Sequence, residues 1–364
     1  MAQGLLSQLP IIISQEEWPF NQEVDPEIYV GSSWPKISIV TPSFNQGKFL
    51  EKTIRSVLLQ NYPNLEFIII DGGSSDNSVE ILSKYASFLT YWVSEPDKGQ
   101  SDALNKGIGR CTGEIFNWLN SDDYLAPDAF FFLGNLFREP RVEVVLARYW
   151  IHDLHSGRNF IEGTHLMCNP AKTAAYCRLH QPASYFRFSA FKKLLPLSQD
   201  LHFTMDYELW ITYLLTQGQT AVVLTEAVAA HFLIHPQSKS GGQNWSRFFG
   251  DELGIFYALA THYQLNNVVN FLERQKNWPV LKQYTLKKKL QNLPLAQVKQ
   301  VCAYFLLRSA ELFYGEDKFQ EALFWAKSVD SEALTEPDQK LLNKILFRSR
   351  FLWPLVKLGR LLRK

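Results

Sequence analysis

Two apolar runs that end abruptly in carboxylates constrain this chain more than any other feature. Residues 68–70 lead directly into Asp71, and residues 116–119 lead into Asn120-Ser121-Asp122-Asp123. A short apolar run of this kind is typical of a buried parallel strand. Open α/β sheets bind their ligands at the carboxyl ends of such strands. The pattern therefore predicts an α/β sheet with acidic groups gathered at its ligand-binding edge.

Carboxylates packed this closely repel one another unless a positive charge lies among them. A divalent cation that bridges a diphosphate is the usual solution, and Mg²⁺ in proteins is commonly bound by carboxylates together with phosphate oxygens. The two acidic turns thus indicate a metal-assisted enzyme that acts on a nucleoside diphosphate compound.

Composition limits the alternatives. A chain of 364 residues is long enough for two units, and 46% hydrophobic residues supply an ample core. The formal net charge of +1 gives no indication of nucleic-acid binding. The four cysteines form no Cys-x-x-Cys pair, and neither a signal peptide nor an eighteen-residue apolar run occurs. We expect a cytoplasmic protein whose membrane contact, if any, is peripheral.

Strand and helix patterns alternate from Lys36 to about Asp128. This order predicts a doubly wound, mostly parallel, Rossmann-like sheet. The helix expected over residues 48–60 has apolar side chains at helical spacing and stops before Asn61-Tyr62-Pro63. The expected strands cover residues 37–44, 65–73, 89–97 and 114–123, and further helices begin near residues 78 and 101.

A Ser/Gly cluster at residues 238–242 predicts a domain boundary. We expect an N-terminal extension (1–34), an α/β domain (35–243) and a helical C-terminal domain (244–364). The segment after Asp338 contains eight Lys or Arg and no Asp or Glu, interleaved with apolar residues. Such a tail suits an anionic membrane surface. The alternative is a packed terminal helix with solvated basic side chains.

Three motifs in order resemble the family-2 inverting glycosyltransferases of GT-A fold. They are residues 35–78 (PKISIVTPSFNQGKFLEKTIRSVLLQNYPNLEFIIIDGGSSDNS), residues 94–107 (SEPDKGQSDALNKG) and residues 118–130 (WLNSDDYLAPDAF). The resemblance extends from Pro35 to about Ser240. It implies transfer of a sugar, with inversion at the anomeric carbon, from a nucleoside diphosphate sugar to the hydroxyl of a glycan or lipid-linked acceptor. A uridine donor is favoured.

The resemblance implies that Thr41, Pro42, Ser43 and Asp71 hold the nucleoside. Asp71 has a carboxylate that can accept a hydrogen bond from the imide N–H of uracil. The resemblance also implies that two further acids, Asp97 and Asp102, flank the donor, although a loop rich in Asp, Lys and Gly is also ordinary turn chemistry. For Asp76 we favour a structural role, as a cap of the helix that follows.

Asn120-Ser121-Asp122-Asp123 stands where the family has its Asp-x-Asp metal motif, with Asn120 in place of the first Asp. Asp122 and Asp123 are therefore the expected ligands of a divalent cation, Mn²⁺ or Mg²⁺, and Asn120 is expected to contact the ribose or the cation. In the later basic loop, His235 is a candidate additional metal ligand and Lys239 a candidate partner of the diphosphate.

An inverting transfer is a single displacement, so one carboxylate must remove the acceptor proton. Asp206 matches the family's base, although Met205 replaces the Glu that usually precedes it. The structural alternative is that Asp206 is an N-terminal helix residue favoured by the helix dipole. Glu208 is the second choice. His180 and Gln181 resemble the segment that lies near acceptor and diphosphate.

Two other functions compete with this interpretation. A non-catalytic nucleotide-sugar scaffold or sensor is suggested by Asn120, Met205 and the helical tail, but the retained acids argue against it. A nucleotidyltransferase would need a Gly-rich basic phosphate loop after the first strand. The chain has Thr41-Pro42-Ser43 there instead.

Overall fold

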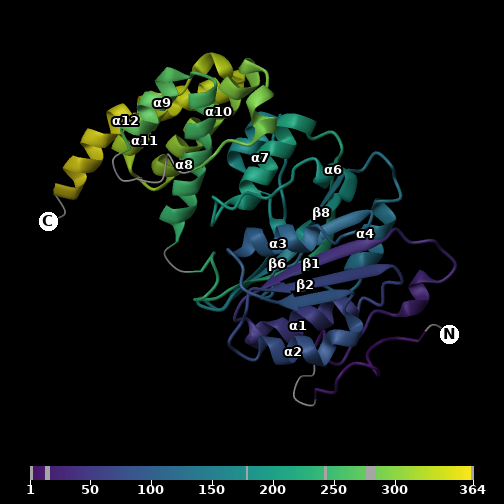
Figure 1. Cartoon of the computed structure of the whole chain (residues 1–364). Helices are drawn as coiled ribbons and strands as arrows, with labels where there is room; N and C mark the ends of the chain where they lie inside the picture. Colours follow the sequence, from purple (N-terminus) through teal and green to yellow (C-terminus); the bar gives the residue numbers. More distant parts are fainter. Residues whose placement is uncertain (1–2, 13–16, 178, 242–243, 276–283, 362–364) are drawn as a thin grey trace. The chain divides into compact units, whose positions relative to one another are not determined.

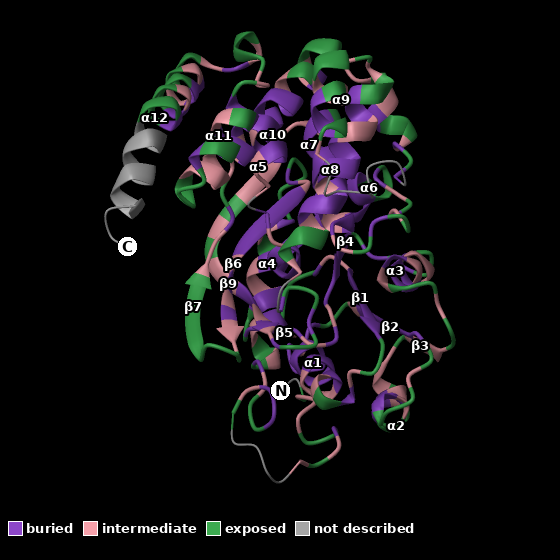
Figure 2. Ribbon diagram, turned by 90° about the vertical axis from the view of Figure 1, so that its left-hand side faces the viewer, coloured by how far each residue is buried: buried purple, intermediate pink, exposed green. Residues whose placement is uncertain are grey.

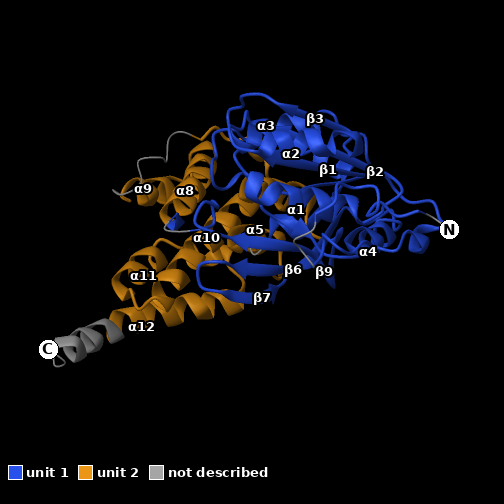
Figure 3. Cartoon of the chain, turned by 90° about the horizontal axis from the view of Figure 1, so that it is seen from below, with its two compact units in different colours: residues 1–164, 179–206, 220–245 blue, residues 165–178, 207–219, 246–364 orange. Residues whose placement is uncertain are grey.

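The computed structural model describes residues 3–12, 17–177, 179–241, 244–275 and 284–361, with the backbone alone over 352–361. The chain divides into two compact units that interleave along the sequence (Figures 1 and 3). Unit 1 comprises residues 1–164, 179–206 and 220–245, and unit 2 comprises residues 165–178, 207–219 and 246–364. The predicted boundary near residue 243 lies close to the last crossing, whereas the sequence patterns did not indicate the two earlier excursions.

Unit 1 is built on one twisted sheet with the order β3-β2-β1-β4-β8-β6-β9-β5, and β7 pairs with β6 at the side. The neighbouring strands β1 to β4 are parallel, and so are β6 and β9, while the remaining pairs are antiparallel. The strands are β1 (Ile37–Ser43), β2 (Leu65–Asp71), β3 (Tyr91–Ser94), β4 (Ile115–Trp118), β5 (Tyr124–Leu125), β6 (Val144–Asp153), β7 (Arg158–Glu162), β8 (Ser184–Arg187) and β9 (Val222–Ile234).

Crossover helices explain why the first half of the sheet is parallel. The α/β connections are α1 (Gly47–Leu58), α2 (Ser78–Tyr85) and α3 (Gln100–Ile108). All seven residues of β1 are buried, as expected for a strand covered on both faces. The predicted doubly wound arrangement is thus confirmed for β1 to β4. Figure 2 shows the buried residues of β1 and β2 in purple and the exposed strand β7 in green.

The predicted helix over residues 48–60 is α1, which ends two residues earlier than expected. Its apolar face is buried through Leu50, Ile54 and Val57. Asn61 follows with φ of 50°, a left-handed conformation that Asn tolerates better than most residues. Unit 1 also contains α4 (Ala129–Leu136), α6 (Phe188–Lys192) and the short 3₁₀ turns η1 (Pro26–Tyr29), η2 (Ala86–Phe88) and η3 (Gln181–Ala183).

A buried arginine ties the N-terminal extension to unit 1. Arg55 on α1 is 2% exposed, and its guanidinium donates to the backbone carbonyls of Pro10, Pro19 and Phe20 at 3.0–3.1 Å. It also donates to the Tyr85 hydroxyl. The five N–H donors of arginine suit such a set of carbonyls, so the extension is an integral layer of this unit.

Unit 2 is helical, as predicted for the C-terminal region. It contains α5 (Pro170–Tyr176), α7 (Met205–Gln217, from Tyr207 onward), α8 (Trp245–His262, from Ser246 onward), α9 (Asn266–Glu273), η5 (Lys288–Asn292), α10 (Leu295–Gly315), α11 (Phe319–Ala326), η6 (Ser331–Ala333) and α12 (Glu336–Leu361). Its core includes stacked aromatic rings, of which Phe256 and Phe305 have centroids 3.9 Å apart. No helix within the described residues is long and apolar enough to cross a membrane.

Candidate active site

Strand register brings three of the polar strand ends together. Ser43 at the end of β1 is paired with Asp71 at the end of β2, and Asp71 is paired with Ser94 at the end of β3. The Ser94 hydroxyl donates to Asp71 Oδ2 at 2.7 Å. The carboxyl edge of the parallel sheet thus carries a contiguous polar row, in the position that the sequence predicted.

Asp71 organises the turn that follows β2. Its carboxylate accepts from the Ser74 hydroxyl at 2.5 Å and from the backbone N–H groups of Gly73 and Ser74 at 3.2 and 2.8 Å. Asp71 is fully buried, and Oδ2 accepts three of its four hydrogen bonds. Oδ1 accepts only one, so it retains capacity for a further donor. The predicted contact with a base stays a prediction.

The hydroxyls of Thr41 and Ser43 have no hydrogen-bond partner within the described structure, although both residues are buried. Thr41 is 0% exposed and Ser43 is 4% exposed. A buried hydroxyl without a partner costs roughly 1–3 kcal/mol, so proteins seldom retain one without a reason. Both residues belong to the segment predicted to hold the nucleoside.

Asp76 caps two helices at once, which confirms the structural role favoured for it. Its two oxygens accept from the backbone N–H groups of Gly47 and Ser78, the first residues of α1 and α2, each at 2.9 Å. Burial raises the pKa of this carboxyl, but the hydrogen bonds from Ser78 and Gly47 outweigh that effect and hold the pKa below its ordinary value.

The second motif forms a loop against the first. Asp97 accepts from Gly99 N–H at 2.7 Å, and its carboxylate lies so close to Gly72 that a Cβ there would be 2.7 Å from Asp97 Oδ2. Gly72 therefore makes room for Asp97. Gly99 has φ of 107°, a conformation that favours glycine, and α3 begins immediately after it.

Asp102, in the first turn of α3, closes the same loop. Its carboxylate accepts from Lys98 N–H and from Gln199 Nε2, both at 3.1 Å. Lys106 lies 3.6 Å from Asp102 and 2.9 Å from Glu95. An acid in the first turn also interacts favourably with the helix dipole. These contacts hold the loop, and the predicted role of Asp102 beside the donor stays a prediction.

Asp122 and Asp123 lie in different environments although they are adjacent. Asp123 is 1% exposed and accepts from Leu233 N–H at 3.1 Å and from Asn120 Nδ2 at 3.3 Å. Burial and the negative charge of Asp122 together raise the pKa of Asp123 well above its ordinary value. Each of the two Asp123 oxygens thus accepts a hydrogen bond from the protein, Oδ1 from Leu233 and Oδ2 from Asn120.

Asp122 instead meets the imidazole of His235. Asp122 Oδ2 lies 3.1 Å from His235 Nε2, and the Phe49 ring packs on the imidazole with centroids 4.5 Å apart. His235 is buried, whereas the Asp122 side chain is 17% exposed. One carboxylate and one imidazole suit a divalent cation that draws its other ligands from phosphate and water.

No ready-made cation cage exists among the described residues, because no three His, Cys, Asp or Glu side chains are grouped as a metal site. Of the three predicted ligands, Asp122 and His235 are adjacent, while Asp123 is bonded toward Leu233 and Asn120. His231 belongs to a different cluster, bonded to His152 at 2.9 Å and stacked on Tyr124.

Gln100, on which sequence reasoning placed no role, joins the acidic turn to the basic loop. Its Nε2 donates to Asn120 Oδ1 at 2.8 Å, and its Oε1 accepts from Lys239 Nζ at 2.8 Å. Lys239 also donates to the His202 carbonyl at 2.7 Å. The basic loop is tight, since a Cβ on Gly241 would be 2.0 Å from the His235 carbonyl oxygen. The only sequence signal was the position of Gln100 beside Gly99 in the second motif.

Asp206 is the second residue of α7 and is half-buried. The preceding residue, Met205, is 5% exposed, and its sulfur accepts from the Ser101 hydroxyl at 2.8 Å. Glu208 is fully buried within unit 2, where it pairs with Lys287 at 2.8 Å and accepts from the Tyr284 hydroxyl. This sequestered ion pair disfavours Glu208 as a proton acceptor, so Asp206 stays the better candidate.

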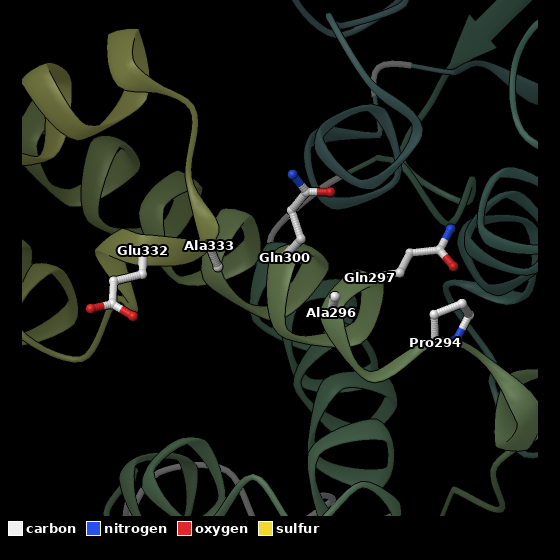
Figure 4. A pocket seen from close by; sticks show the side chains of 6 residues that line it. All are labelled: Pro294, Ala296, Gln297, Gln300, Glu332 and Ala333. Carbon is white, nitrogen blue, oxygen red and sulfur yellow. The ribbon is translucent and has the colours of Figure 1, made fainter.

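The pocket shown in Figure 4 is separate from these residues. It lies in unit 2, has a volume of about 470 Å³, and is lined by Pro294, Ala296, Gln297, Gln300, Glu332 and Ala333. None of the predicted site residues lines it.

Comparison with known proteins concerns the family and the fold of this part of the chain. The sequence model described as Glycosyl transferase family 2 matches residues 38–195. An uncharacterised glycosyltransferase of Mycobacterium tuberculosis is 42% identical over 99 residues, which are 27% of this chain and 38% of the relative. Glycosyltransferase GlyG of Streptococcus pneumoniae is 32% identical over 124 residues, which are 33% of this chain and 41% of the relative. The chain thus spans well under half the length of these two relatives.

Among solved structures, S. aureus TarS 1–349 in complex with UDP superposes with a TM-score of 0.52 at 16% identity, covering 86% of this chain and 88% of TarS 1–349. At this identity the similarity concerns the fold. Together with the sheet order and the family match, it identifies residues 38–195 as a glycosyltransferase family 2 domain of GT-A fold.

Proposed function

We propose that this glycosyltransferase moves a sugar from a nucleoside diphosphate sugar, with UDP favoured, to a hydroxyl of a glycan or lipid-linked acceptor in polysaccharide synthesis, with inversion. The observation that supports this most is the polar row at the sheet edge. Two buried hydroxyls on β1, those of Thr41 and Ser43, lie without partners within the described structure, and Ser43 is paired with Asp71. A nucleoside offers the hydrogen-bonding groups that such hydroxyls need.

Two observations favour a uridine nucleotide, namely the free capacity of Asp71 Oδ1 and the fold similarity to S. aureus TarS. Asp71 Oδ1 accepts one hydrogen bond and can accept another from the imide N–H of uracil. S. aureus TarS has been solved with UDP and with UDP-GlcNAc. We therefore place UDP ahead of GDP as the nucleotide, with Thr41, Pro42, Ser43 and Asp71 around the nucleoside.

Asp122 and His235 would hold a divalent cation, Mn²⁺ or Mg²⁺. When bound, such a cation supplies positive charge that stabilises the leaving diphosphate. On the protein side, Lys239 adds a second positive charge from the basic loop. Asp97 and Asp102 close the loop beside the donor, and Asn120 orients Gln100 and Asp123.

Asp206 would remove the proton from the acceptor hydroxyl during the single displacement. It stands at the beginning of α7, and the buried Met205 and Ser101 fix the backbone next to it. A general base contributes roughly 10²- to 10⁴-fold to a rate. Replacing Asp206 with Asn should therefore lower kcat by about that factor while the Kd for UDP stays unchanged.

Calorimetric thermal unfolding of the purified chain with UDP, GDP or dTDP, each with Mn²⁺, Mg²⁺ or chelator, tests the donor class. Ligand at a hundred times its Kd should stabilise the protein by about 2.7 kcal/mol. The proposal predicts a metal-dependent shift with one nucleotide. A folded protein that shows no shift with any of them would contradict it.

Product analysis separates catalysis from the alternative, a non-catalytic scaffold or sensor. The scaffold is favoured by Met205, which replaces an acidic residue of the family motif, and it would bind nucleotide without turnover. Asp206→Asn and the matched exposed control Asp200→Asn should differ in kcat. Equal turnover of both variants would remove Asp206 from the mechanism.

A peripheral location at the inner face of the cytoplasmic membrane is the last part of the proposal. On α12, Phe347 and Phe351 are 64% and 55% exposed and their rings lie 4.7 Å apart. The exposed Lys344 and Arg348 share this face, as i, i+3 and i, i+4 spacing requires. Side chains beyond Phe351, including the apolar and basic residues of the predicted tail, lie outside the described residues.

Vesicle co-sedimentation tests this surface. Because each buried Phe contributes roughly 1.5–3 kcal/mol, the double variant Phe347→Ser, Phe351→Ser should bind phosphatidylserine vesicles at least about tenfold more weakly. Deletion after Pro354 should weaken binding as well. Leu295→Ser, which changes another exposed apolar residue of unit 2, should not. Full binding by the double variant and the deletion would refute the membrane role.

A further inference from the structure

A row of side-chain amides runs through the site, with each amide donating to the next. Gln100 Nε2 donates to Asn120 Oδ1 at 2.8 Å, and Asn120 Nδ2 lies 3.4 Å from Gln181 Oε1. Gln181 Nε2 donates to Asn117 Oδ1 at 3.2 Å and to the Trp118 carbonyl. We call Gln100, Asn120, Gln181 and Asn117 the amide row. Its first acceptor, Gln100 Oε1, is held by Lys239 Nζ at 2.8 Å.

The amide row explains why residue 120 is Asn where the family motif has Asp. Asn120 Nδ2 faces two acceptors, Asp123 Oδ2 at 3.3 Å and Gln181 Oε1 at 3.4 Å. An aspartate would place a carboxylate oxygen against both of them. Gln181 could turn to accommodate it only by directing its own oxygen toward the Trp118 carbonyl. The direction of the row thus requires an amide at this position.

We infer that Gln100 is a positioning residue for the donor, and that its Oε1 occupies the place at Lys239 Nζ that a diphosphate oxygen takes on binding. This inference rests on the proposed function. An ammonium group bonds a phosphate oxygen more strongly than a neutral amide oxygen, because both partners of the new bond are charged. The exchange is therefore favourable, and Gln100 keeps Lys239 aimed at the diphosphate before the donor arrives.

The inference requires that the side chain at position 100 is uncharged, so that a diphosphate oxygen can displace it from Lys239. A glutamate at this position would hold Lys239 in an ion pair that a diphosphate must break, and it would lose the donation to Asn120 Oδ1, a loss that it shares with Gln100→Ala. Gln100→Glu should therefore slow amide hydrogen exchange in the basic loop, residues 235–241, and weaken UDP binding at least about tenfold. If Gln100 had only a structural role, substituting it would both speed hydrogen exchange in the basic loop and weaken UDP binding. Slower exchange together with weaker UDP binding therefore indicates that the side chain at position 100 competes with the diphosphate.

Two further variants complete the test. Gln100→Ala should speed exchange in the same loop, as Lys239→Ala should, since both remove the Gln100–Lys239 bond. In UDP titrations, Gln100→Ala should cost several-fold in the wild-type background and almost nothing in the Lys239→Ala background. The exposed loop residue Gln237 supplies the control, because Gln237→Glu makes the same charge change without touching the amide row.

Hydrogen exchange without nucleotide tests the contact between Gln100 and Lys239 independently of donor binding. Unchanged loop exchange in Gln100→Ala would overturn the inference even if the wild-type protein binds UDP. The inference would also be overturned if Gln100→Ala and Lys239→Ala had additive effects on UDP affinity, or if Gln100→Glu bound UDP as tightly as the wild type. Absence of UDP binding by the wild type would refute the proposed function together with the diphosphate exchange, and loop exchange would then still report on the Gln100–Lys239 contact.

Discussion

Two buried aspartates, one in each unit, have opposite surroundings. Asp338 in unit 2 is 4% exposed and bonds Lys172 at 2.6 Å, Thr335 at 2.6 Å and Tyr304 at 3.0 Å. Burial raises the pKa of Asp338, but these hydrogen bonds outweigh it and hold the pKa below its ordinary value. Asp123 in unit 1 is equally buried, and its pKa is raised by burial and by Asp122.

The comparison separates an acid that serves the fold from one that belongs to a functional site. The chain itself supplies the cation that compensates Asp338. Beside Asp123 it places another acid instead, which is unfavourable for folding alone. Acids whose pKa values are shifted by burial and by a neighbouring charge cluster at functional sites. Unit 1 thus has a local excess of negative charge at the position where the proposed function requires a cation.

The largest expected effect is the loss of Asp338. Asp338→Ala leaves the half-buried Lys172 without its carboxylate and removes the acceptor of Thr335 and Tyr304, which should reduce the free energy of unfolding of unit 2 by roughly 3 kcal/mol. Urea unfolding, with hydrogen exchange in α10 as a local probe, measures it. Glu336→Ala, which removes an exposed pair with Lys340, should change stability by at most about 0.5 kcal/mol. Equal effects of the two variants would show that the buried carboxylate of Asp338 stabilises unit 2 no more than an exposed one does.

Removing Asp122 should have two opposite consequences. Asp122→Asn deletes the like charge beside Asp123, so we expect the metal-free protein to become about 1 kcal/mol more stable. The same variant should lose the metal-dependent stabilisation by UDP. Thermal unfolding with Mn²⁺ and with chelator measures both. Asp128→Asn is the control, since Asp128 is exposed and its φ of 62° suits Asn. A full metal-dependent shift in Asp122→Asn would exclude Asp122 as a ligand.

The pH dependence of unit 2 follows from Asp338. Because its pKa is lower in the folded protein than its ordinary value of 3.8, its contribution to stability is present above pH 3.8 and is lost as the pH falls through the folded value. Wild type and Asp338→Asn should therefore differ clearly at neutral pH and converge in strong acid. Chemical unfolding between pH 7 and pH 2 checks this. A difference that is constant with pH would contradict an ionic role.

The last comparison removes one buried, unpartnered hydroxyl from each unit and has a small expected effect on stability. Thr41→Val removes the buried hydroxyl in unit 1, and Ser349→Ala removes one in unit 2. Since neither buried hydroxyl has a partner, each substitution removes an unpaired polar group and should raise the free energy of unfolding by roughly 1 kcal/mol. Only Thr41→Val should weaken UDP binding, by roughly five- to tenfold. Isothermal titration checks it, and equal UDP affinity would remove Thr41 from the nucleoside site.

Local patterns were sufficient to predict the parallel half of unit 1 and its polar edge. Each strand from β1 to β4 is a short run of mainly apolar residues, and polar residues follow directly after the last apolar residues of the run. The cap of α2 by Asp76 was predictable for the same reason, since Ser78 lies only two residues further on, whereas the bond from Gly47, which lies 29 residues earlier, was not predicted. The helical character of residues beyond 245 also followed from periodicity.

Contacts between distant segments could not be predicted in this way. The bond from Lys239 to Gln100 joins residues 139 apart, and the bond from Leu233 to Asp123 joins residues 110 apart. The second of these turns Asp123 toward the protein interior, although sequence alone made it equivalent to Asp122. The excursions at 165–178 and 207–219 have partners that lie far along the chain, so no local signal marked them.

The interleaving of the units has a consequence for synthesis on the ribosome. Helix α5 ends at Tyr176, but α10, against which it packs, begins at Leu295. At the usual 5–20 residues per second, roughly 6–24 s separate the appearance of the two helices. During that interval the apolar residues of α5, and of α7 after it, await their partners. Once β9 has been made, at Ile234, a nascent chain of this protein therefore exposes unfinished helical surface while all strands of its sheet are already present.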